Sequence, residues 1–422
     1  MALLVALCLI IMPGAGDDAR ALGTESFVPG QVIVKLAPGV TIGQVNSRYN
    51  TRVQERFLNL TNTDIYLLKT TDGSSAQDKL KEITGDPLPL IRYAELNYLS
   101  DAPEADARHR AFPAGDATPT PRNYSKDAAY SDAALDLSGA QLISKGAGAT
   151  VAVLDTGAQL DHPALKARFA GVPRYDFVDD DTNPSEPSLA RNKDQLAQEV
   201  VGHGTHVAGI VALVAPQANI MPLRVLDRQG YGSVFHVAEA ITFSDTKGAD
   251  VINLSLGTPS WSRLLREKVD EAIGAGAVVI AAAGNDNSLQ SQYPASNLVP
   301  VALKEDGLLA VTSVSALEKK STFSNYGTWV DIAAPGEDIL SAYPVSKYAY
   351  WSGTSMATPF VAGEAALIHA KYGSLRPAGI EGRIRSGARC LDQKNPTYVG
   401  MLGAGHADVG ASLEQTEGQH CI

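Results

Sequence analysis

Cysteine, aromatic residues and positive charge are all scarce in this chain, and each scarcity excludes a class of protein. Three cysteines among 422 residues are too few for a small fold held together by disulfides. Aromatic residues make up 6% of the chain and the net charge at pH 7 is −11, so binding to nucleic acid or to an anionic membrane through basic residues is not expected. With 45% hydrophobic and 19% charged residues, the composition indicates a globular protein rather than a disordered or fibrous one.

An unbroken apolar run at residues 2–12 is shorter than the roughly 20 residues that a membrane-spanning helix needs. Because Pro13-Gly14 and the small residues around Ala19-Arg20-Ala21 follow it, we interpret residues 1–21 as a secretory signal peptide. The protein is then expected outside the cytoplasm, either secreted or periplasmic. No Lys or Arg precedes the run, which leaves a buried N-terminal strand or helix as the alternative.

The number of cysteines is compatible with a secreted or periplasmic protein. Cys8 would leave with the signal peptide, and Cys390 and Cys421 would remain. In an exported protein these two can form one disulfide. Two unpaired thiols near a C-terminal tail at residues 412–422 are the alternative.

A small unit with both helix and strands is predicted for residues 26–100. Strand patterns occur at residues 31–36, 65–70 and 91–99, with a helical pattern at 76–84 between them. Residues 101–129 are rich in Ala, Asp and Pro, as exposed linkers are. A protease would cut most easily in such a segment.

From residue 130 onward the pattern changes to short apolar strands that alternate with helical stretches. Continuous Val, Ile and Ala runs without alternation indicate strands that are buried on both faces, and therefore a parallel sheet between layers of helices. These runs lie at residues 149–154, 220–225, 251–256, 277–282 and 308–314.

Four motifs place a polar side chain at the end of a predicted strand or the start of a predicted helix, where functional groups of α/β proteins gather. Asp155 ends the strand pattern VAVLD, and His203 begins a helix in GHGTHVAG. Asn285 follows the strand pattern AAAG, and Ser355 begins a helix in GTSMATP. A serine at a helix N-terminus has a backbone N–H that can face an anion.

Each motif alone has another explanation. Asp-Thr-Gly at residues 155–157 also occurs in aspartic proteases, but the chain holds no second copy. His203 and His206 could ligate zinc, although no third ligand stands at a recognisable spacing. Asn285 could belong to a turn, and Ser355 could be a helix N-cap.

Together the four residues indicate one chemistry. A serine hydroxyl is a poor nucleophile unless an adjacent base takes its proton, and that base needs a carboxylate to orient it. Ser355, His203 and Asp155 supply these roles, and the Asn285 amide can donate to a developing oxyanion. The chain order Asp, His, Ser is the order found in subtilisins.

These motifs resemble the subtilisin-like serine proteases, the subtilases. The resemblance runs from Ala149 to Ala411 and rests on the following blocks: VAVLDTG (151–157), GHGTHVAG (202–209), VINLSLG (251–257), AAAGN (281–285), FSNYG (323–327), AAPG (333–336) and GTSMATPFVAG (353–363). The N-terminal unit resembles a subtilase propeptide through VPGQVIVKL (28–36) and YAELNYL (93–99).

The resemblance implies an α/β fold: a subtilisin-like peptidase domain at residues 130–411, with a parallel sheet flanked by helices, behind a small ferredoxin-like propeptide. It implies a serine endopeptidase that forms an acyl-enzyme, with Asp155, His203 and Ser355 as the triad and Asn285 in the oxyanion hole. The propeptide would act as folding template and inhibitor, and self-processing within residues 101–129 would remove it. A permanently attached accessory domain is the alternative.

The resemblance also implies where a substrate binds. The segments expected around it are Gly230, Tyr231 and Gly232 as an edge strand, with Ser255, Leu256, Gly257, Ala282, Ala283 and Gly284 around the primary specificity pocket. None of these residues is acidic, so a broad preference for apolar side chains is expected. The expected partners are protein or peptide substrates and the chain's own propeptide, and the enzyme is expected to be a monomer.

No cofactor is expected for the chemistry. Asp176, Asp179 and Asp181 form an acidic loop that resembles a structural calcium site of some subtilases, although a solvated acidic loop is equally compatible with it. Two rival functions are a catalytically dead subtilase fold kept for binding and a sedolisin-type enzyme. The complete set of Asp155, His203, Asn285 and Ser355 argues against both, because sedolisins use a Glu base and an Asp oxyanion donor.

Overall fold

The computed structural model describes residues 26–87, 90–105, 111–115, 117–126, 134–187, 199–296 and 307–415. The predicted signal peptide lies outside these residues. Cys390 is disulfide-bonded, and the two other cysteines, Cys8 and Cys421, also lie outside the described residues.

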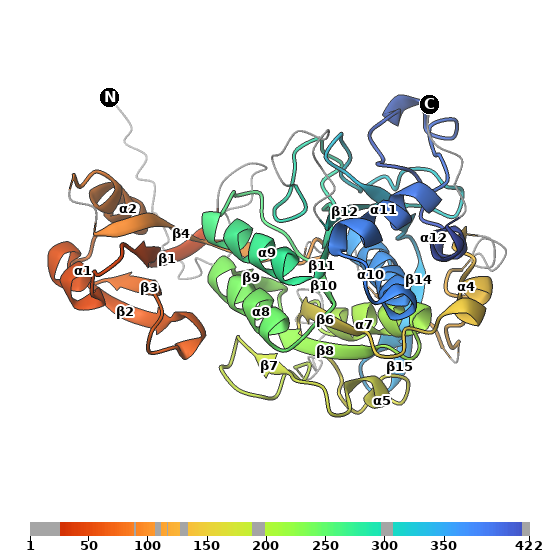
Figure 1. Ribbon diagram of the computed structural model, residues 1–422, viewed down its shortest axis with the longest axis horizontal. Coiled ribbons are helices and arrows are strands. Elements are labelled where there is room, and N and C mark those ends of the chain that lie inside the picture. The colour runs from red at the N-terminus through yellow and green to blue at the C-terminus, as the bar shows by residue number, and fades with distance from the viewer. Residues whose placement is uncertain are drawn as a thin grey trace, which may run out of the picture.

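The N-terminal unit, residues 26–101, is an antiparallel sheet with two helices (Figure 1). Its strands occur in the order β2-β3-β1-β4, and α1 and α2 connect β1 to β2 and β3 to β4, which is the ferredoxin-like arrangement. The elements are β1 (Phe27–Leu36), α1 (Ile42–Tyr49), β2 (Thr51–Arg56), the 3₁₀ turn η1 (Phe57–Asn59), β3 (Ile65–Thr70), α2 (Ala76–Thr84) and β4 (Ile91–Asp101).

The larger unit, residues 134–415, is built on a seven-stranded sheet whose neighbouring strands all run parallel. The strand order is β13-β12-β11-β10-β6-β8-β7. These strands are β6 (Thr150–Asp155), β7 (Tyr175–Asp176), β8 (Asn219–Arg224), β10 (Val251–Leu254), β11 (Val278–Ala282), β12 (Leu308–Val314) and β13 (Ile332–Pro335). The predicted fold class is therefore confirmed.

Helices cover both faces of this sheet (Figure 1). They are α4 (Leu137–Ile143), α5 (Lys166–Phe169), α7 (His203–Val214), α8 (Val234–Thr246), α9 (Arg263–Ala275), α10 (Thr354–Tyr372), α11 (Pro377–Gly387) and α12 (Val409–Glu414). The smaller elements are β9 (Tyr231–Ser233), the 3₁₀ turn η3 (Pro396–Tyr398) and a three-stranded sheet of β5 (Phe112–Pro113), β14 (Ile339–Tyr343) and β15 (Lys347–Trp351).

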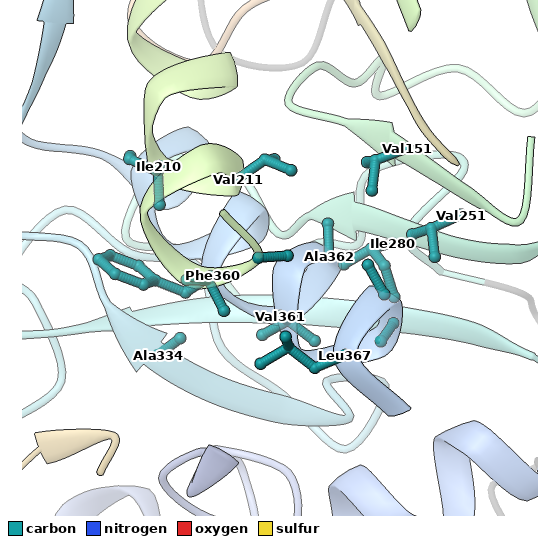
Figure 2. Close-up of a cluster of buried hydrophobic side chains, with 14 of the residues drawn as sticks. Val151, Ile210, Val211, Val251, Ile280, Ala334, Phe360, Val361, Ala362 and Leu367 are labelled. Atoms are coloured by element: carbon teal, nitrogen blue, oxygen red, sulfur yellow. The ribbon is translucent and has the colours of Figure 1, made fainter. Parts of the chain in front are cut away.

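The alternation of side chains along each strand divides the core into two layers. Val151 and Val153 of β6 pack with residues of α7 and α10, whereas Ala152 and Leu154 pack with residues of α8 and α9. Both pairs are buried, which explains why residues 151–154 of β6 are all apolar. Figure 2 shows the first layer, where Val361 and Leu367 of α10 lie against the sheet.

Most predicted elements agree with the structure, and two elements of the N-terminal unit were missed. The predicted helix at 76–84 and the strands at 65–70 and 308–314 have the same bounds as α2, β3 and β12. The prediction omitted α1 and β2. Strand β2 reads TRVQER and alternates between buried or half-buried and exposed positions, so the apolar run by which the other strands were recognised is missing.

The two units share a sheet edge and several polar contacts. Strand β4 pairs with β9 of the larger unit, so the sheet order continues as β2-β3-β1-β4-β9. The Glu95 carboxylate accepts hydrogen bonds from the backbone N–H groups of Arg263 and Leu264, at 2.7 and 3.1 Å. A carboxylate is favoured there because these N–H groups begin α9 and carry the positive end of the helix dipole. Figure 1 shows the N-terminal unit beside α8 and α9.

The predicted linker differs from the structure at its start. Ser100 and Asp101 continue β4, and Asp101 pairs with Tyr231 of β9. Among the helices formed by the described residues, none is long and apolar enough to cross a membrane.

The packing of α10 generates a stability prediction. The Phe360 side chain is 1% exposed, and its ring centroid lies 4.9 Å from that of Tyr124. Phe360→Ala should lower the free energy of unfolding by about 3–5 kcal/mol, because it removes buried apolar surface and leaves a cavity. Denaturant unfolding measures this, in a Ser355→Ala background to avoid proteolysis. Leu317→Ala is the control: Leu317 is 74% exposed, and a change of about 0.5 kcal/mol or less is expected. Equal losses in the two variants would contradict this packing.

Candidate active site

The four predicted catalytic residues lie together at the carboxyl edge of the parallel sheet. Asp155 is the last residue of β6, and Asn285 follows the end of β11. His203 is the first residue of α7, and Ser355 is the second residue of α10. Since the carboxyl ends of parallel strands meet at one edge, residues that are up to 200 positions apart in the chain become neighbours.

Asp155 and His203 form a buried pair. Asp155 Oδ1 lies 2.7 Å from His203 Nδ1, and neither side chain is exposed to solvent. The backbone N–H of Thr156 donates to the same carboxylate oxygen at 2.7 Å. Gly204 permits this approach of α7 to β6, because a Cβ at that position would lie 2.0 Å from the carbonyl oxygen of Gly157. The carboxylate therefore has one orientation, with His203 held in front of it.

The predicted bond between His203 and Ser355 is replaced by contacts of both residues with Glu104. Glu104 Oε2 lies 2.9 Å from His203 Nε2 and 2.5 Å from Ser355 Oγ. The Glu104 side chain is completely buried. Ser355 Oγ also lies 3.2 Å from the carbonyl oxygen of Ser255. A carboxylate from the segment that follows the N-terminal unit therefore lies between Ser355 and His203.

The second oxygen of Glu104 identifies the donors of an anion site. Asn285 Nδ2 donates to Glu104 Oε1 at 2.8 Å, and the Ser355 backbone N–H points to the same oxygen at 3.4 Å. Thr354 orients the Asn285 amide, because its N–H and its hydroxyl both lie 3.0 Å from Asn285 Oδ1. Gly353 leaves room for the anion: a Cβ there would lie 1.6 Å from Glu104 Oε1.

The charges of this cluster stabilise one another. Burial alone would lower the pKa of His203, but Asp155 and Glu104 raise it to about 10. Burial would raise the pKa of Glu104, but hydrogen bonds and charge from His203, with further bonds from Ser355 and Asn285, lower it below its ordinary value. His203 is therefore an imidazolium between two carboxylates at neutral pH. Such a histidine cannot accept a proton from Ser355.

The predicted substrate-binding segments contact the chain just before Glu104. Tyr231 and Gly232 of β9 pair with Asp101 and Ser100 of β4. On the other side, Asp101 and Gly257 exchange two backbone hydrogen bonds of 2.9 Å. The chain thus enters the active site as an extended strand between two neighbours, as a bound peptide would.

The remaining predicted pocket residues lie around this strand. The Gly230 carbonyl accepts the Ala102 N–H at 2.9 Å. Ser255 Oγ lies 3.0 Å from the carbonyl oxygen of Ser355, and Leu256 is buried beyond it. Ala282, Ala283 and Gly284 form the buried end of β11 and the turn after it.

The contacts of His206 indicate a structural role. Its Nε2 lies 3.1 Å from the Ile339 carbonyl and 3.0 Å from the Ala349 carbonyl, and its ring lies edge to face with Trp351. Burial lowers the pKa of His206 to about 3. His206 is therefore neutral and joins α7 to β14 and β15.

The acidic loop proposed for calcium already holds a cation. Arg224 Nη1 lies 2.7 Å from Asp176 Oδ2 and 2.5 Å from Asp179 Oδ2. The other oxygen of Asp176 accepts backbone N–H groups of Val178 and Asp179, and Asp181 Oδ1 accepts that of Asn183 at 2.7 Å. These carboxylates do not fit a shared calcium ion, because the Arg224 guanidinium already pairs with Asp176 and Asp179, and oxygens of Asp176 and Asp181 accept backbone N–H groups.

The sequence argument missed two buried carboxyl groups beside the triad. Glu104 lies in an Ala- and Pro-rich stretch with no local pattern that distinguishes it from a linker acid. Glu186 Oε1 accepts hydrogen bonds from the Thr156 hydroxyl at 2.9 Å and the Thr205 N–H at 3.2 Å. Burial, with repulsion from Asp155, raises the pKa of Glu186 to about 7. Only the fold brings either residue to the triad.

The pairing of His203 generates a prediction about pH. Because its folded pKa of about 10 exceeds its ordinary value of about 6.5, its pairing stabilises the folded state fully below pH 6.5 and ceases to do so as the pH rises through 10. In Ser355→Ala protein, imidazole NMR signals should report a charged His203 from pH 6 to 9. Glu104→Gln should lower the pKa of His203. Titration of His203 near pH 6.5 with Glu104 in place would contradict the ion pair.

Comparison with solved structures supports the arrangement of both units. Fervidolysin from Fervidobacterium pennivorans, described as a keratinolytic enzyme related to subtilisin, superposes with a TM-score of 0.73 over 94% of this chain and 62% of its own. At 23% identity this likeness establishes the fold alone. A protease from Pseudoalteromonas arctica PAMC 21717 is 32% identical, with a TM-score of 0.57, over 67% of this chain and 94% of its own.

Sequence comparison identifies the family. The thermophilic serine proteinase of Bacillus sp. strain AK1 is 39% identical over 66% of this chain, which spans 63% of that protein's length. Thermitase of Thermoactinomyces vulgaris is 43% identical over 54% of this chain and 76% of its own length. The model of the fervidolysin N-terminal prodomain matches residues 13–97, and the model of the subtilase family matches residues 146–405. The chain therefore belongs to the subtilase family and carries a fervidolysin-like N-terminal prodomain.

Proposed function

We propose that this protein is a secreted serine endopeptidase that is made as a self-processing zymogen. The observation that carries the proposal is the convergence of four groups on one buried carboxylate. Ser355 Oγ and His203 Nε2 contact one oxygen of Glu104, and the Asn285 amide and the Ser355 N–H contact the other. A nucleophile, a base and two anion donors around one carboxylate-sized space are what peptide hydrolysis requires.

In the proposed mechanism, the scissile carbonyl carbon takes the place now held by the Glu104 carboxylate. Ser355 Oγ attacks this carbon while its proton passes to His203 Nε2, and His203 later gives that proton to the leaving amine. The carbonyl oxygen becomes an oxyanion that accepts hydrogen bonds from Asn285 Nδ2 and the Ser355 N–H. Asp155 keeps Nε2 free to act as the base by accepting a hydrogen bond from the Nδ1–H group, and it stabilises the imidazolium. Water then hydrolyses the acyl-enzyme by the same steps.

Substrate is proposed to bind as an extended strand in the place now taken by residues 99–102. Pairing through Gly257 and β9 involves backbone groups only, so it accepts many sequences. The pocket segments near it are Ser255, Leu256, Ala282, Ala283 and Gly284, which offer no carboxylate to select a basic side chain. This supports a broad specificity that favours apolar side chains.

The remaining parts of the proposal concern the state of the mature enzyme. Removal of the prodomain is proposed to occur within residues 101–129, and the mature peptidase is proposed to be a monomer. None of the proposed chemical steps uses a cofactor. A structural calcium ion remains a prediction, and the contacts of Arg224 with Asp176 and Asp179 give it no support at the loop first considered.

Latency is proposed to depend on Glu104. Its carboxylate keeps water and substrate from Ser355, fills the anion site and holds His203 in the charged form that cannot act as a base. No peptide carbonyl can reach Ser355 while this side chain stays in place. Self-processing therefore requires that residues 102–105 shift, so that a peptide bond replaces the Glu104 carboxylate.

The assignment of Asn285 generates the first functional prediction. Asn285→Ala should lower turnover of casein by about 10²–10³-fold, the loss found when a subtilisin loses one oxyanion donor. Turnover is measured on the matured protein, with Ser355→Ala as the inactive reference. The Ser355→Ala protein should also keep its full mass, whereas the unsubstituted chain should lose its N-terminal 100–130 residues. Nearly normal turnover in Asn285→Ala would refute this role of the amide.

The assignment of Glu104 generates the second functional prediction. Glu104→Ala opens the anion site and frees His203, so the full-length precursor should disappear at least severalfold faster than the unsubstituted precursor. A time course of intact mass after refolding at pH 7 measures this. Asp78→Ala is the control, because Asp78 is an exposed acid of α2 that lies 3.8 Å from Lys81. Unchanged or slower processing in Glu104→Ala would argue against the proposed latency.

A further inference from the structure

Three potential metal ligands meet where the prodomain contacts the peptidase domain, away from the active site. Glu55 belongs to β2 of the prodomain, and His236 and Glu239 belong to α8 of the peptidase domain. One ligand atom from each of the three lies within 4.8 Å of the others. Neither the sequence patterns nor the proposed mechanism uses these residues. Figure 1 shows α8 beside the prodomain.

The geometry of α8 brings two of the ligands together. His236 and Glu239 are three positions apart in one helix, so their side chains project from the same face. The hydroxyl of Ser233, the N-cap of α8, accepts the His236 N–H at 3.2 Å, which fixes where the helix begins. Glu55 approaches from the opposite side, with Oε2 at 3.1 Å from His236 Nε2. The three side chains therefore face one another across the contact between the two units.

The charges at this point are unbalanced. The Glu239 side chain is buried, at 2% exposure, and one of its oxygens accepts the Leu58 N–H at 2.5 Å. Its ligand oxygen lies within 4.8 Å of a carboxylate oxygen of Glu55. Two carboxylates that face each other in a partly buried place need a cation or a shared proton to balance them.

The ligand types favour one class of cation. One imidazole nitrogen and two carboxylate oxygens suit zinc and similar first-row ions, whereas calcium and magnesium prefer oxygen ligands alone. Around a tetrahedral ion with ligands at about 2.0–2.1 Å, neighbouring ligand atoms are about 3.3–3.4 Å apart. The observed separation of 3.1 Å between His236 Nε2 and Glu55 Oε2 is close to that value. The ligand atoms of all three residues lie within 4.8 Å of one another.

We propose that Glu55, His236 and Glu239 bind one zinc-type divalent cation that joins the prodomain to the peptidase domain. Two ligands come from the peptidase domain and one from the prodomain, so the complete site exists only while the two are docked. The cation then strengthens docking through β2 and α8, whereas the strand that enters the active site is β4. The role of the cation in docking rests on the proposed zymogen function. Binding of the cation to these three residues does not depend on that function.

The test uses the full-length Ser355→Ala protein, in which catalysis and processing play no part. After removal of metal with EDTA, the protein is incubated with zinc chloride, freed of unbound ion by gel filtration and analysed for metal. We expect one zinc per chain. Cobalt in place of zinc should give the visible absorption bands of a tetrahedral site. Zinc should also raise the Tm of this protein, because it binds only the folded state.

Matched variants identify the ligands. His236→Ala and Glu55→Gln should lose the bound zinc, the cobalt bands and the rise in Tm, with unchanged circular dichroism. His369→Ala is the control: His369 also lies 3.1 Å from a carboxylate, that of Asp250, and both histidine side chains are 24% exposed. It should retain one zinc.

Two outcomes would overturn the proposal. One is a Ser355→Ala protein that retains no zinc, which would mean that a shared proton alone balances the two carboxylates. The other is zinc that survives His236→Ala. Since no step of the test measures proteolysis, a failure here would leave the proposed peptidase function unaffected, and loss of peptidase activity would leave the metal site unaffected.

Discussion

The arrangement of the whole active site depends on the buried charge of His203. An imidazolium without access to water is costly unless carboxylates surround it. Asp155 supplies one carboxylate from the end of β6, and Glu104 supplies the other from the end of the prodomain. In the proposed mechanism the first contact orients the base. The second stabilises the protonated form of the imidazole, which has no free nitrogen to accept a proton, so under the proposal the same histidine serves both catalysis and latency.

The prodomain reaches this histidine because the two units use backbone groups to dock. Strand β4 extends the prodomain sheet onto β9, and Glu95 and Asn97 accept N–H groups at the starts of α9 and α8. Strand edges and helix N-termini present unpaired N–H and C=O groups whatever their side chains. Docking of this kind sets the direction of the chain and places Glu104 beside His203 and Ser355.

The sequence was sufficient to predict four residues that the structure brings together, but not the state in which they are found. Asp155, His203, Asn285 and Ser355 stand in long local motifs whose glycines and apolar neighbours reflect the strand or helix that holds each one. The structure places all four around one space. Glu104 and Glu186 have no such local signal, because burial beside the triad arises from chain segments brought together only by the fold. The Arg224 contact with Asp176 and Asp179 could not be predicted for the same reason. An acidic run resembles a metal site as long as the cationic side chain that pairs with it is unknown.

Secondary structure shows the same division between local and tertiary causes. Strands β3 and β12 and helix α2 follow strong apolar or helical patterns, and their predicted bounds agree with the structure. Strand β2 contains one apolar residue, Val53, and is a strand because β3 pairs with it. This edge strand is also the element that carries Glu55 toward α8. A weakly patterned strand can therefore hold a residue that matters for docking.

Docking at two separate places has a consequence for release. While the chain is intact, the covalent tether keeps the prodomain at a high effective concentration, so each individual contact can be weak. If the tether is cut as proposed, only the non-covalent contacts remain, and their joint strength sets the rate at which the prodomain leaves. Under the two proposals, Glu104 determines whether the active site is blocked, whereas Glu95 and the group formed by Glu55, His236 and Glu239 determine how long the prodomain stays bound. Because these sets of contacts lie on different elements, inhibition and residence time can be altered independently by substitution at one place or the other.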